Sequence, residues 1–251
     1  MKLPISYGRQ YISDGDIQAV VETLKSDYLT CGPKIPEFEQ AFCEYVHAKY
    51  SVAVCNATAA LHIAAMALGV KEGDNVICTP MTFASSANCI RFCGGNVKFV
   101  DIDPETYLLD INKLKEILST APKGTYKGMV LVDFAGYPHN MEEYRKVADE
   151  YGMWILEDAC HAPGAYFIDS TGERVYCGCG KYSDITVFSF HPVKHITTGE
   201  GGMACTQNKE YYEKMALYRT HGITHEAEKL QREDGLWYYE MQELGYNYRI
   251  T

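Results

Sequence analysis

The chain has 251 residues, of which 47% are hydrophobic and 22% charged, so it is long enough to bury a substantial core and has an ordinary globular composition. Its formal net charge of −10 argues against a nucleic-acid-binding face, although backbone amides and hydroxyls can still hold an anionic ligand locally. Ten cysteines without regular spacing, an N-terminus without an apolar core of signal length and no stretch long enough to span a membrane favour a soluble, reduced, cytoplasmic protein.

The first 70 residues carry clear helix-capping signals. Residues 13–16 offer a cap for an amphipathic helix, and Pro36 suits the first turn of a second one. Asn56 precedes a third helix, which Gly69 closes. The expected elements are, in order, helix 17–26, a loop at 28–33, helix 37–48, strand 51–55 and helix 59–69.

From residue 75 onward, apolar strands alternate with helices of about ten residues. Residues 166–181 are expected to form a hairpin excursion, and residues 223–251 show no clear period. This alternation predicts an α/β fold with a mostly parallel sheet flanked by helices. The expected strands are 75–80, 96–103, 128–136, 153–159, 186–190 and 201–206, and the expected helices are 85–94, 111–120, 141–152 and 209–222.

Lys194 is the first candidate catalytic residue. An apolar strand leads to it, Pro192 and Val193 precede it, and a glycine-rich turn follows. An amine held in such surroundings loses solvation of its charged form and becomes a better nucleophile. A surface lysine on a loop is the alternative interpretation, but the position of Ser189 before it and of the turn after it favour a functional role.

Three further positions could bind a ligand with the lysine. The amides at the start of the helix after Asn56, with the Thr58 hydroxyl, could hold a phosphate, although a plain helix cap is the commoner explanation. Asp158 and His161 follow an apolar strand and are therefore expected at the sheet edge where open α/β sheets bind ligands. The alternative is that the carboxylate only caps the next segment and that His161 is a histidine with ordinary, satisfied hydrogen bonds. Phe83 could stack on a flat ring or belong to the core.

Pyridoxal 5'-phosphate (PLP) would satisfy all these positions at once. It has a phosphate, a flat ring with a basic nitrogen and an aldehyde that condenses with a lysine. Lys194 would form the Schiff base, and Asp158 would pair with the pyridinium nitrogen so that the ring acts as an electron sink. No metal site is expected, because no cysteine pair has a second partner pair at tetrahedral zinc spacing.

The motifs together resemble the DegT/DnrJ/StrS family of sugar aminotransferases, almost from end to end. The segments that carry the resemblance include TCGPKIPEFEQAF, NATAALHIAAMALG, VICTPMTFASSAN, ILEDACHAPGA, FSFHPVKHITTGEGG and GYNYRIT. The resemblance implies the type I (aspartate-aminotransferase-like) fold, with its small C-terminal domain missing or truncated here. It divides the chain into an N-terminal segment with a substrate loop (1–35), a PLP-binding large domain (36–222) and the start of a connection to the C-terminal domain (223–251).

The resemblance also implies roles for individual residues. Lys194 and Asp158 are catalytic, and Asn247 reaches the cofactor phosphate of a neighbouring subunit, so a homodimer is expected. Tyr7 and the loop from Asp27 through Tyr28 and Leu29 to Thr30 line the sugar-nucleotide side. The implied cofactor contacts are Ala57, Thr58, Phe83, Asp158, His161, Ser189, Lys194 and Asn247.

Within the family, HPVK followed by ITTGEGG is most similar to transaminases of pseudaminic acid biosynthesis. The resemblance therefore implies transfer of an amino group from L-glutamate to the C4 ketone of a UDP-linked 4-keto-6-deoxy-N-acetyl sugar, for a surface or flagellar glycan. A truncated, non-catalytic PLP-binding or nucleotide-sugar-binding protein is the alternative. A sugar dehydratase is disfavoured because Lys194 is not replaced by histidine, and a nicotinamide enzyme because no strand leads into G-x-G-x-x-G.

Overall fold

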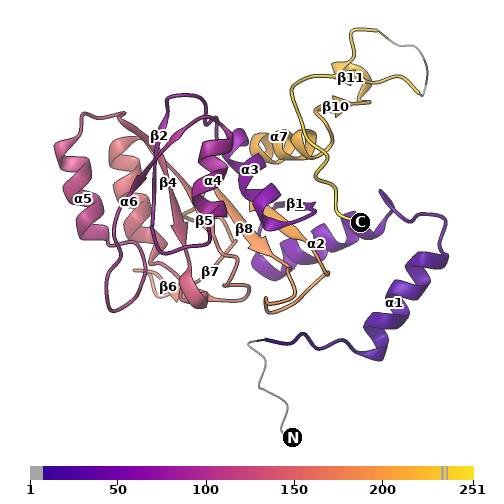
Figure 1. Ribbon diagram of the computed structural model, residues 1–251, viewed down its shortest axis with the longest axis horizontal. Coiled ribbons are helices and arrows are strands. Elements are labelled where there is room, and N and C mark those ends of the chain that lie inside the picture. Colours follow the sequence, from indigo (N-terminus) through magenta and orange to yellow (C-terminus); the bar gives the residue numbers. More distant parts are fainter. Residues whose placement is uncertain (1–7, 233–234, 236) are drawn as a thin grey trace, which may run out of the picture.

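A seven-stranded sheet forms the centre of the computed structural model, which describes residues 8–232, 235 and 237–251 (Figure 1). The strand order is β1-β9-β8-β5-β4-β2-β3. β9 pairs antiparallel with both of its neighbours, whereas the pairs from β8 to β3 are all parallel. The predicted, mostly parallel sheet is therefore confirmed. The strands are β1 (Tyr50–Val54), β2 (Asn75–Cys78), β3 (Asn96–Phe99), β4 (Tyr126–Val132), β5 (Trp154–Asp158), β8 (Ile185–Ser189) and β9 (Gly202–Thr206).

Helices cover both faces of this sheet. On one face, α3 (Ala57–Ala67), α4 (Ser85–Phe92) and α7 (Lys209–Arg219) pack on Val130, Leu156 and other side chains of that face. On the other face lie α2 (Lys34–Val46), α5 (Ile111–Thr120) and α6 (Met141–Tyr151). Because successive strand residues face opposite sides, β5 supplies Leu156 to one core and Ile155 to the other.

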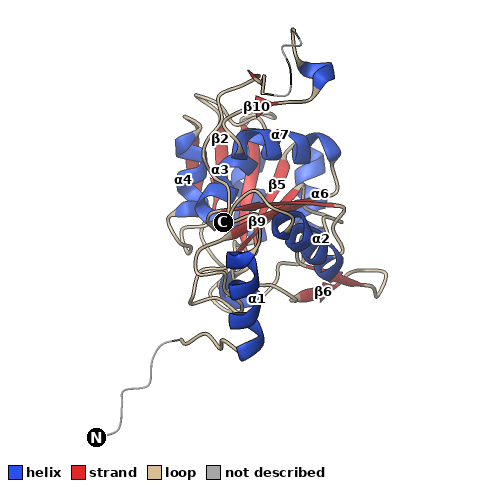
Figure 2. Ribbon diagram, turned by 90° about the vertical axis from the view of Figure 1, so that its right-hand side faces the viewer, coloured by secondary structure: helices blue, strands red, loops and turns tan. Residues whose placement is uncertain are grey.

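The helix at the N-terminal end of the described chain, α1 (Asp14–Lys25), lies outside these layers. Its predicted cap is confirmed: Asp16 N–H donates to Ser13 Oγ at 3.2 Å, and Ser13 N–H donates to Asp16 Oδ2 at 2.7 Å. None of the residues of α1 is buried, and Figure 2 shows it in front of the body of the protein. Local capping rather than packing therefore defines this helix.

The chain after α7 forms a small outlying unit and then returns to the body of the protein. β10 (Ile223–Thr224) pairs antiparallel with β11 (Glu240–Met241), and this pair projects from the sheet layers in Figure 1. The last residues then run along α7 and β1: Tyr246 N–H donates to Tyr218 O at 2.7 Å, and Cys55 N–H donates to Tyr248 O at 2.8 Å. Among the described residues, no helix has both the length and the apolar character that a membrane crossing needs.

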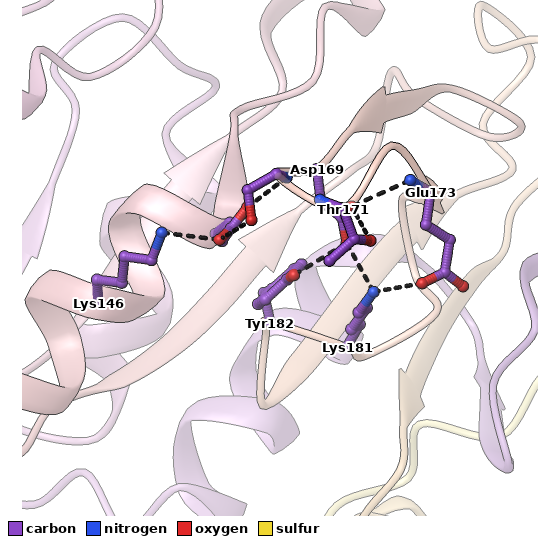
Figure 3. A network of polar contacts seen from close by, with 8 residues as sticks. Lys146, Asp169, Thr171, Glu173, Lys181 and Tyr182 are labelled. Carbon is purple, nitrogen blue, oxygen red and sulfur yellow. Dashed lines mark hydrogen bonds and ion pairs between the residues drawn. The ribbon is translucent and has the colours of Figure 1, made fainter.

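The predicted excursion is confirmed as a hairpin of β6 (Tyr166–Ile168) and β7 (Arg174–Tyr176), and a buried carboxylate organises it. Asp169 accepts hydrogen bonds from the backbone N–H groups of Thr171 (2.9 Å) and Glu173 (3.1 Å) and from the Tyr182 hydroxyl (3.1 Å). It also pairs with Lys181 Nζ at 2.7 Å (Figure 3). These donors, the lysine first, lower the pKa of Asp169 well below its ordinary value.

The hairpin turn is also attached to α6. Glu142 accepts hydrogen bonds from the backbone N–H of Ser170 at 2.8 Å and from its hydroxyl at 2.7 Å. Its carboxylate also pairs with Lys146 Nζ at 2.7 Å (Figure 3). Glu142 thus fixes the hairpin turn to α6, while Asp169 holds the turn together from within.

We expect Asp169→Ala to lower the melting temperature and to make the hairpin more sensitive to proteolysis, because Lys181 and the turn amides lose a shared acceptor. Thermal unfolding and limited proteolysis would measure this. Glu173→Gln is the matched control, since it keeps the Asp169–Lys181 pair and should have a much smaller effect. Equal effects of the two substitutions would contradict the central role of Asp169.

Candidate active site

A pocket of about 740 Å³ opens where the carboxyl ends of β4, β5 and β8 meet the N-terminus of α3. Parallel strands deliver the residues at their carboxyl ends to the same edge of a sheet, which is where α/β folds bind ligands. The pocket is lined by Asn56, Ala57, Thr58, Ala59, Leu61, Thr82, Phe83, Ser85, Phe92, Val132, Phe134, Asp158, Cys160, His161, Ser189, His191, Val193, Lys194, Glu200 and Tyr248.

One end of the pocket is suited to an anion. Asn56 Oδ1 accepts from Ala59 N–H at 2.9 Å, and the first intrahelical bond runs from Ala60 N–H to Asn56 O at 3.1 Å. The N–H groups of Ala57 and Thr58 precede this ladder and remain available to a ligand at the positive end of the helix. The Thr58 hydroxyl lies 2.7 Å from that of Ser85 on α4.

Gly202 lets β9 approach this helix end closely. A Cβ atom at Gly202 would lie 2.6 Å from Ala57 N and 2.5 Å from Asn56 C, which is too close for any side chain. The predicted phosphate residue Ser189 is paired with Gly202 in the β8–β9 ladder, is buried and lines the same pocket. The structure therefore brings Ala57, Thr58 and Ser189 together.

Asp158 ends β5 and is buried, with 5% of its surface exposed. Its Oδ2 accepts from the Ser86 hydroxyl at 2.6 Å, and its Oδ1 accepts from Cys160 N–H at 3.2 Å. These two donors fix the carboxyl group at the pocket wall. Such a carboxylate can receive a proton-bearing ring nitrogen from the ligand side.

His161 lies beside this carboxylate, and its tautomer follows from one contact. The backbone N–H of Ala135 donates to His161 Nδ1 at 3.3 Å, so the ring proton of the neutral imidazole is on Nε2. Burial, followed by the nearby charge of Lys194, lowers the pKa of His161 below its ordinary value. The residue therefore presents a neutral ring, with Nε2–H as its free hydrogen-bond donor.

Lys194 is carried by the loop that joins β8 to β9. This loop is anchored at its base, where Phe190 N–H donates to Gly201 O at 2.9 Å and Thr198 N–H donates to Phe190 O at 3.1 Å. Lys194 N–H in turn donates to His191 O at 2.9 Å. The lysine is half-buried and lines the pocket.

Phe83 lies at the mouth of the pocket rather than in the core. Its side chain is 77% exposed although the residue lines the cavity. An exposed aromatic ring at this position is free to cover a flat ligand. Phe134 adds a second aromatic ring to the lining.

Not every predicted site residue is in this pocket. Residues 27–30, the predicted substrate loop, are exposed and do not line the pocket. Asn247 does not line the pocket either and forms an isolated bridge with Thr220. Tyr7 lies outside the described residues. The roles of these residues remain predictions.

Several lining residues were not predicted from the sequence. Tyr248 reaches the pocket although the sequence motif drew attention to Asn247, its neighbour. Tyr248 OH lies 3.0 Å from Nδ1 of the buried His62, which connects it to α3. Ser85 also lines the pocket and, with its fully buried neighbour Ser86, belongs to the TFASSAN segment, in which the sequence predicts a role only for Phe83. The run of hydroxyl residues after a strand was the available signal.

A second group of ionisable residues is buried behind Asp158, on the opposite face of β5. Asp133 Oδ1 accepts from the backbone N–H of His139 at 3.0 Å and pairs with its Nδ1 at 2.9 Å. Cys177 Sγ donates to Asp133 Oδ2 at 3.3 Å. Glu157 Oε2 accepts from the hydroxyls of Thr186 at 2.6 Å and of Ser183 at 2.8 Å.

Bound protons explain how these acidic side chains can lie together in the core. The ligand atoms of Asp133, Glu157 and Cys177 lie within 4.8 Å of one another, a spacing that could also suit a metal ion. Burial raises the pKa of Asp133 to about 7 and that of Glu157 to about 8, and the two carboxyl groups share a hydrogen bond. One proton on Glu157 lets it donate to Asp133 and removes one of two buried charges.

This pair predicts a contribution to stability that falls as the pH rises. The folded protein holds protons that unfolded carboxyl groups release near pH 4, so the stability contributed by the pair is fully present below that pH and is lost as the pH rises through about 8. The slope is about 1.4 kcal/mol per pH unit for each proton. Glu157→Gln, which can still donate to Asp133, should flatten the slope.

Urea unfolding between pH 5 and 9 would measure this effect. The exposed Glu116→Gln substitution on α5 is the control and should leave the slope of the wild-type protein unchanged. If Glu157→Gln also left the slope unchanged, the shared proton would be contradicted.

The donor set of the main pocket fits a phosphorylated pyridine aldehyde. Helix amides and hydroxyls lie where a phosphate would be held, a buried carboxylate can face a ring nitrogen, and a lysine is available to a carbonyl carbon. The fold and the pocket thus define a PLP-binding α/β protein of the aminotransferase type.

Comparison with known proteins gives the family. Residues 10–251 match the DegT/DnrJ/EryC1/StrS aminotransferase family, and the chain belongs to this family. It is 40% identical over 248 residues to the UDP-4-amino-4,6-dideoxy-N-acetyl-beta-L-altrosamine transaminase of Campylobacter jejuni, with 98% of this chain and 61% of that protein covered. The family resemblance in the sequence is therefore confirmed.

Solved structures confirm the type I fold. The Helicobacter pylori aminotransferase PseC, described as involved in the biosynthesis of pseudoaminic acid, has a TM-score of 0.85 at 29% identity, covering 98% of this chain and 61% of that one. The PLP-form of the putative sugar aminotransferase Spr1654 from Streptococcus pneumoniae has a TM-score of 0.82 at 28% identity, covering 98% and 63%. The chain thus spans about three fifths of the length of the relatives it matches.

Proposed function

We propose that this chain forms the PLP-binding part of a nucleotide-sugar aminotransferase. The observation that carries the proposal is that Lys194, Asp158 and the N-terminus of α3 line one pocket. Each supplies what one part of the cofactor requires: an amine, a carboxylate and an anion site. The family of the chain supports the same activity.

The residues of the pocket would divide the work as follows. Ala57, Thr58 and Ser189 hold the phosphate through backbone amides and hydroxyls. Asp158 faces the ring nitrogen, and Phe83 covers the ring. His161 would lie beside the ring and offer its Nε2–H as a hydrogen-bond donor. Because its ring is neutral, it would not attract the phosphate as a cation would.

Bound PLP supplies an electron sink for the transfer of an amino group. Lys194 would hold the cofactor when no substrate is present and, once displaced, its amine would be the group that moves the proton at the Cα atom of the donor. In the second half-reaction the same amine moves a proton at C4 of the sugar.

For the substrates, we propose L-glutamate as donor and a UDP-linked 4-keto-6-deoxy-N-acetyl sugar as acceptor, in surface or flagellar glycan (pseudaminic acid) biosynthesis. The name of the Campylobacter jejuni relative and the description of the Helicobacter pylori structure support this choice. Tyr7 and residues 27–30 would line the sugar-nucleotide side. The site of action would be the cytoplasm, where nucleotide sugars are made.

We further propose a homodimer in which Asn247 of one subunit contacts the cofactor phosphate of the other. The exposed apolar side chains at the pocket mouth support an interface there: Phe83 is 77% exposed and Val193 is 50% exposed. Asn247 lies next to Tyr248, which lines the pocket of its own chain, so the segment runs close to the site.

The alternative is a protein that binds PLP or a nucleotide sugar without catalysis. Retention of Lys194 and of the complete donor set in the pocket favours the enzyme. The response of the bound cofactor to glutamate distinguishes the two, because only a catalytic site transfers the amino group and removes the aldehyde.

We predict that the purified chain with added PLP shows the visible absorbance band of lysine-bound cofactor and that glutamate abolishes the band. Lys194→Ala should lose the band completely, because Lys194 is the one lysine among the described residues that line the pocket and no other amine there replaces the covalent bond. Absorbance spectra before and after glutamate addition would test this. Lys209→Ala, on the exposed side of α7, is the control and should behave as the wild type.

A band that glutamate leaves unchanged would favour the non-catalytic alternative. A chain without any band, or a Lys194→Ala variant that keeps it, would contradict the assignment of the lysine.

A further inference from the structure

Ser86 is the buried group in closest polar contact with Asp158. It lies in the first turn of α4, none of its surface is exposed, and its hydroxyl donates to Asp158 Oδ2 at 2.6 Å. Cys89 and Ile90 of the same helix are fully buried in the core. The position of the Ser86 hydroxyl is therefore set by the packing of α4 on the sheet.

The direction of the hydrogen bonds around Ser86 follows from the chemistry of the partners. An ionised carboxylate can only accept, and the other acceptor of the Ser86 hydroxyl, Phe83 O, is farther away at 3.3 Å, so the Ser86 proton is directed to Asp158. The Ser86 oxygen then accepts from the Thr82 hydroxyl, which lies 2.7 Å away. Thr82, Ser86 and Asp158 form a chain of donors that ends on a charged oxygen, in which each bond strengthens the next.

Besides Ser86, the polar neighbours of the Asp158 carboxylate are buried thiols, together with His161 and Lys194 of the same pocket. The thiols of Cys78, Cys89 and Cys160 lie nearby, and burial followed by the neighbouring negative charges raises the pKa of each, so they stay neutral. Among the described residues, the side chain of Asp158 accepts one hydrogen bond besides that from Ser86, and its donor is Cys160 N–H. A carboxylate at 5% exposure needs such donors to remain charged.

We propose that Ser86, supported by Thr82, is a positioning residue that keeps Asp158 a carboxylate, so that the proton shared with the cofactor stays on the ring nitrogen. The proposal rests on the proposed function, since it concerns bound PLP. Without the Ser86 hydroxyl, the shared proton moves toward Asp158 and the ring becomes a neutral pyridine. The electron-sink property of the ring depends on that proton.

The experiment is ¹⁵N NMR of the full chain loaded with PLP that is ¹⁵N-labelled in the ring, because the ¹⁵N shift reports directly whether this nitrogen carries the proton. In the wild type we expect a protonated ring nitrogen at pH 8. Ser86→Ala should move the protonation equilibrium by about tenfold or more toward the neutral ring, the size expected for a lost hydrogen bond to a charged group. Ser86→Thr, which keeps the hydroxyl, should restore the wild-type signal.

Two further variants make the test specific. Thr82→Val removes only the outer donor and should give a shift between those of the wild type and Ser86→Ala. Ser51→Ala removes a buried hydroxyl remote from the pocket, which donates to Glu39 O at 2.9 Å, and should leave the ¹⁵N signal unchanged. Circular dichroism of each variant would verify that it is folded.

The outcomes separate this inference from the proposed function. If wild-type PLP binds through Lys194 and Ser86→Ala has the wild-type ¹⁵N shift, the positioning role is wrong while the cofactor assignment stands. If the wild type binds no PLP, both fall together. Should Ser86→Ala not fold, the decision passes to Thr82→Val, and an unchanged signal there would overturn the proposal.

Discussion

The pocket depends on one backbone contact, the approach of β9 to the first turn of α3 at Gly202. A side chain there would collide with Asn56 and with Ala57 N, so only a glycine allows the two elements to meet. The contact places the end of the lysine-bearing loop next to the helix amides that would hold a phosphate. The two ends of the proposed cofactor are therefore positioned by the same piece of backbone.

β5 extends this arrangement through the sheet. Its successive residues Glu157 and Asp158 point to opposite faces of the sheet, so their carboxyl groups have different neighbours. Asp158 faces the pocket and receives donors suited to an ionised carboxylate. Glu157 faces Asp133, with which it shares a hydrogen bond, and keeps its proton. Adjacent carboxyl groups on one strand thus meet different hydrogen-bond partners on the two sides of the sheet.

Much of the fold and part of the site could be predicted from the sequence. The strand–helix alternation and the caps at Ser13 and Asn56 are local signals, and the structure confirms them. Lys194, Asp158 and Thr58 follow strands or begin a helix, so the rule that ligands bind at the carboxyl ends of parallel strands was enough to bring them together.

The remaining site residues depend on tertiary contacts that no local pattern reveals. Ser86 meets Asp158 across 72 positions of sequence, and His62 meets Tyr248 across 186. The antiparallel direction of β9 likewise follows from the route of the loop after β8 rather than from the residues of the strand itself. The predicted substrate loop at residues 27–30 is exposed on a segment without tertiary packing, so its role depends on groups outside this pocket.

The most direct test of the central claim is to reduce the PLP-loaded chain with borohydride and locate the cofactor by peptide mass spectrometry. Reduction makes the bond between lysine and cofactor permanent, and the account predicts a single modified peptide with the added mass on Lys194. A modification spread over exposed lysines, or one at another single lysine, would contradict the assignment of this pocket as the cofactor site.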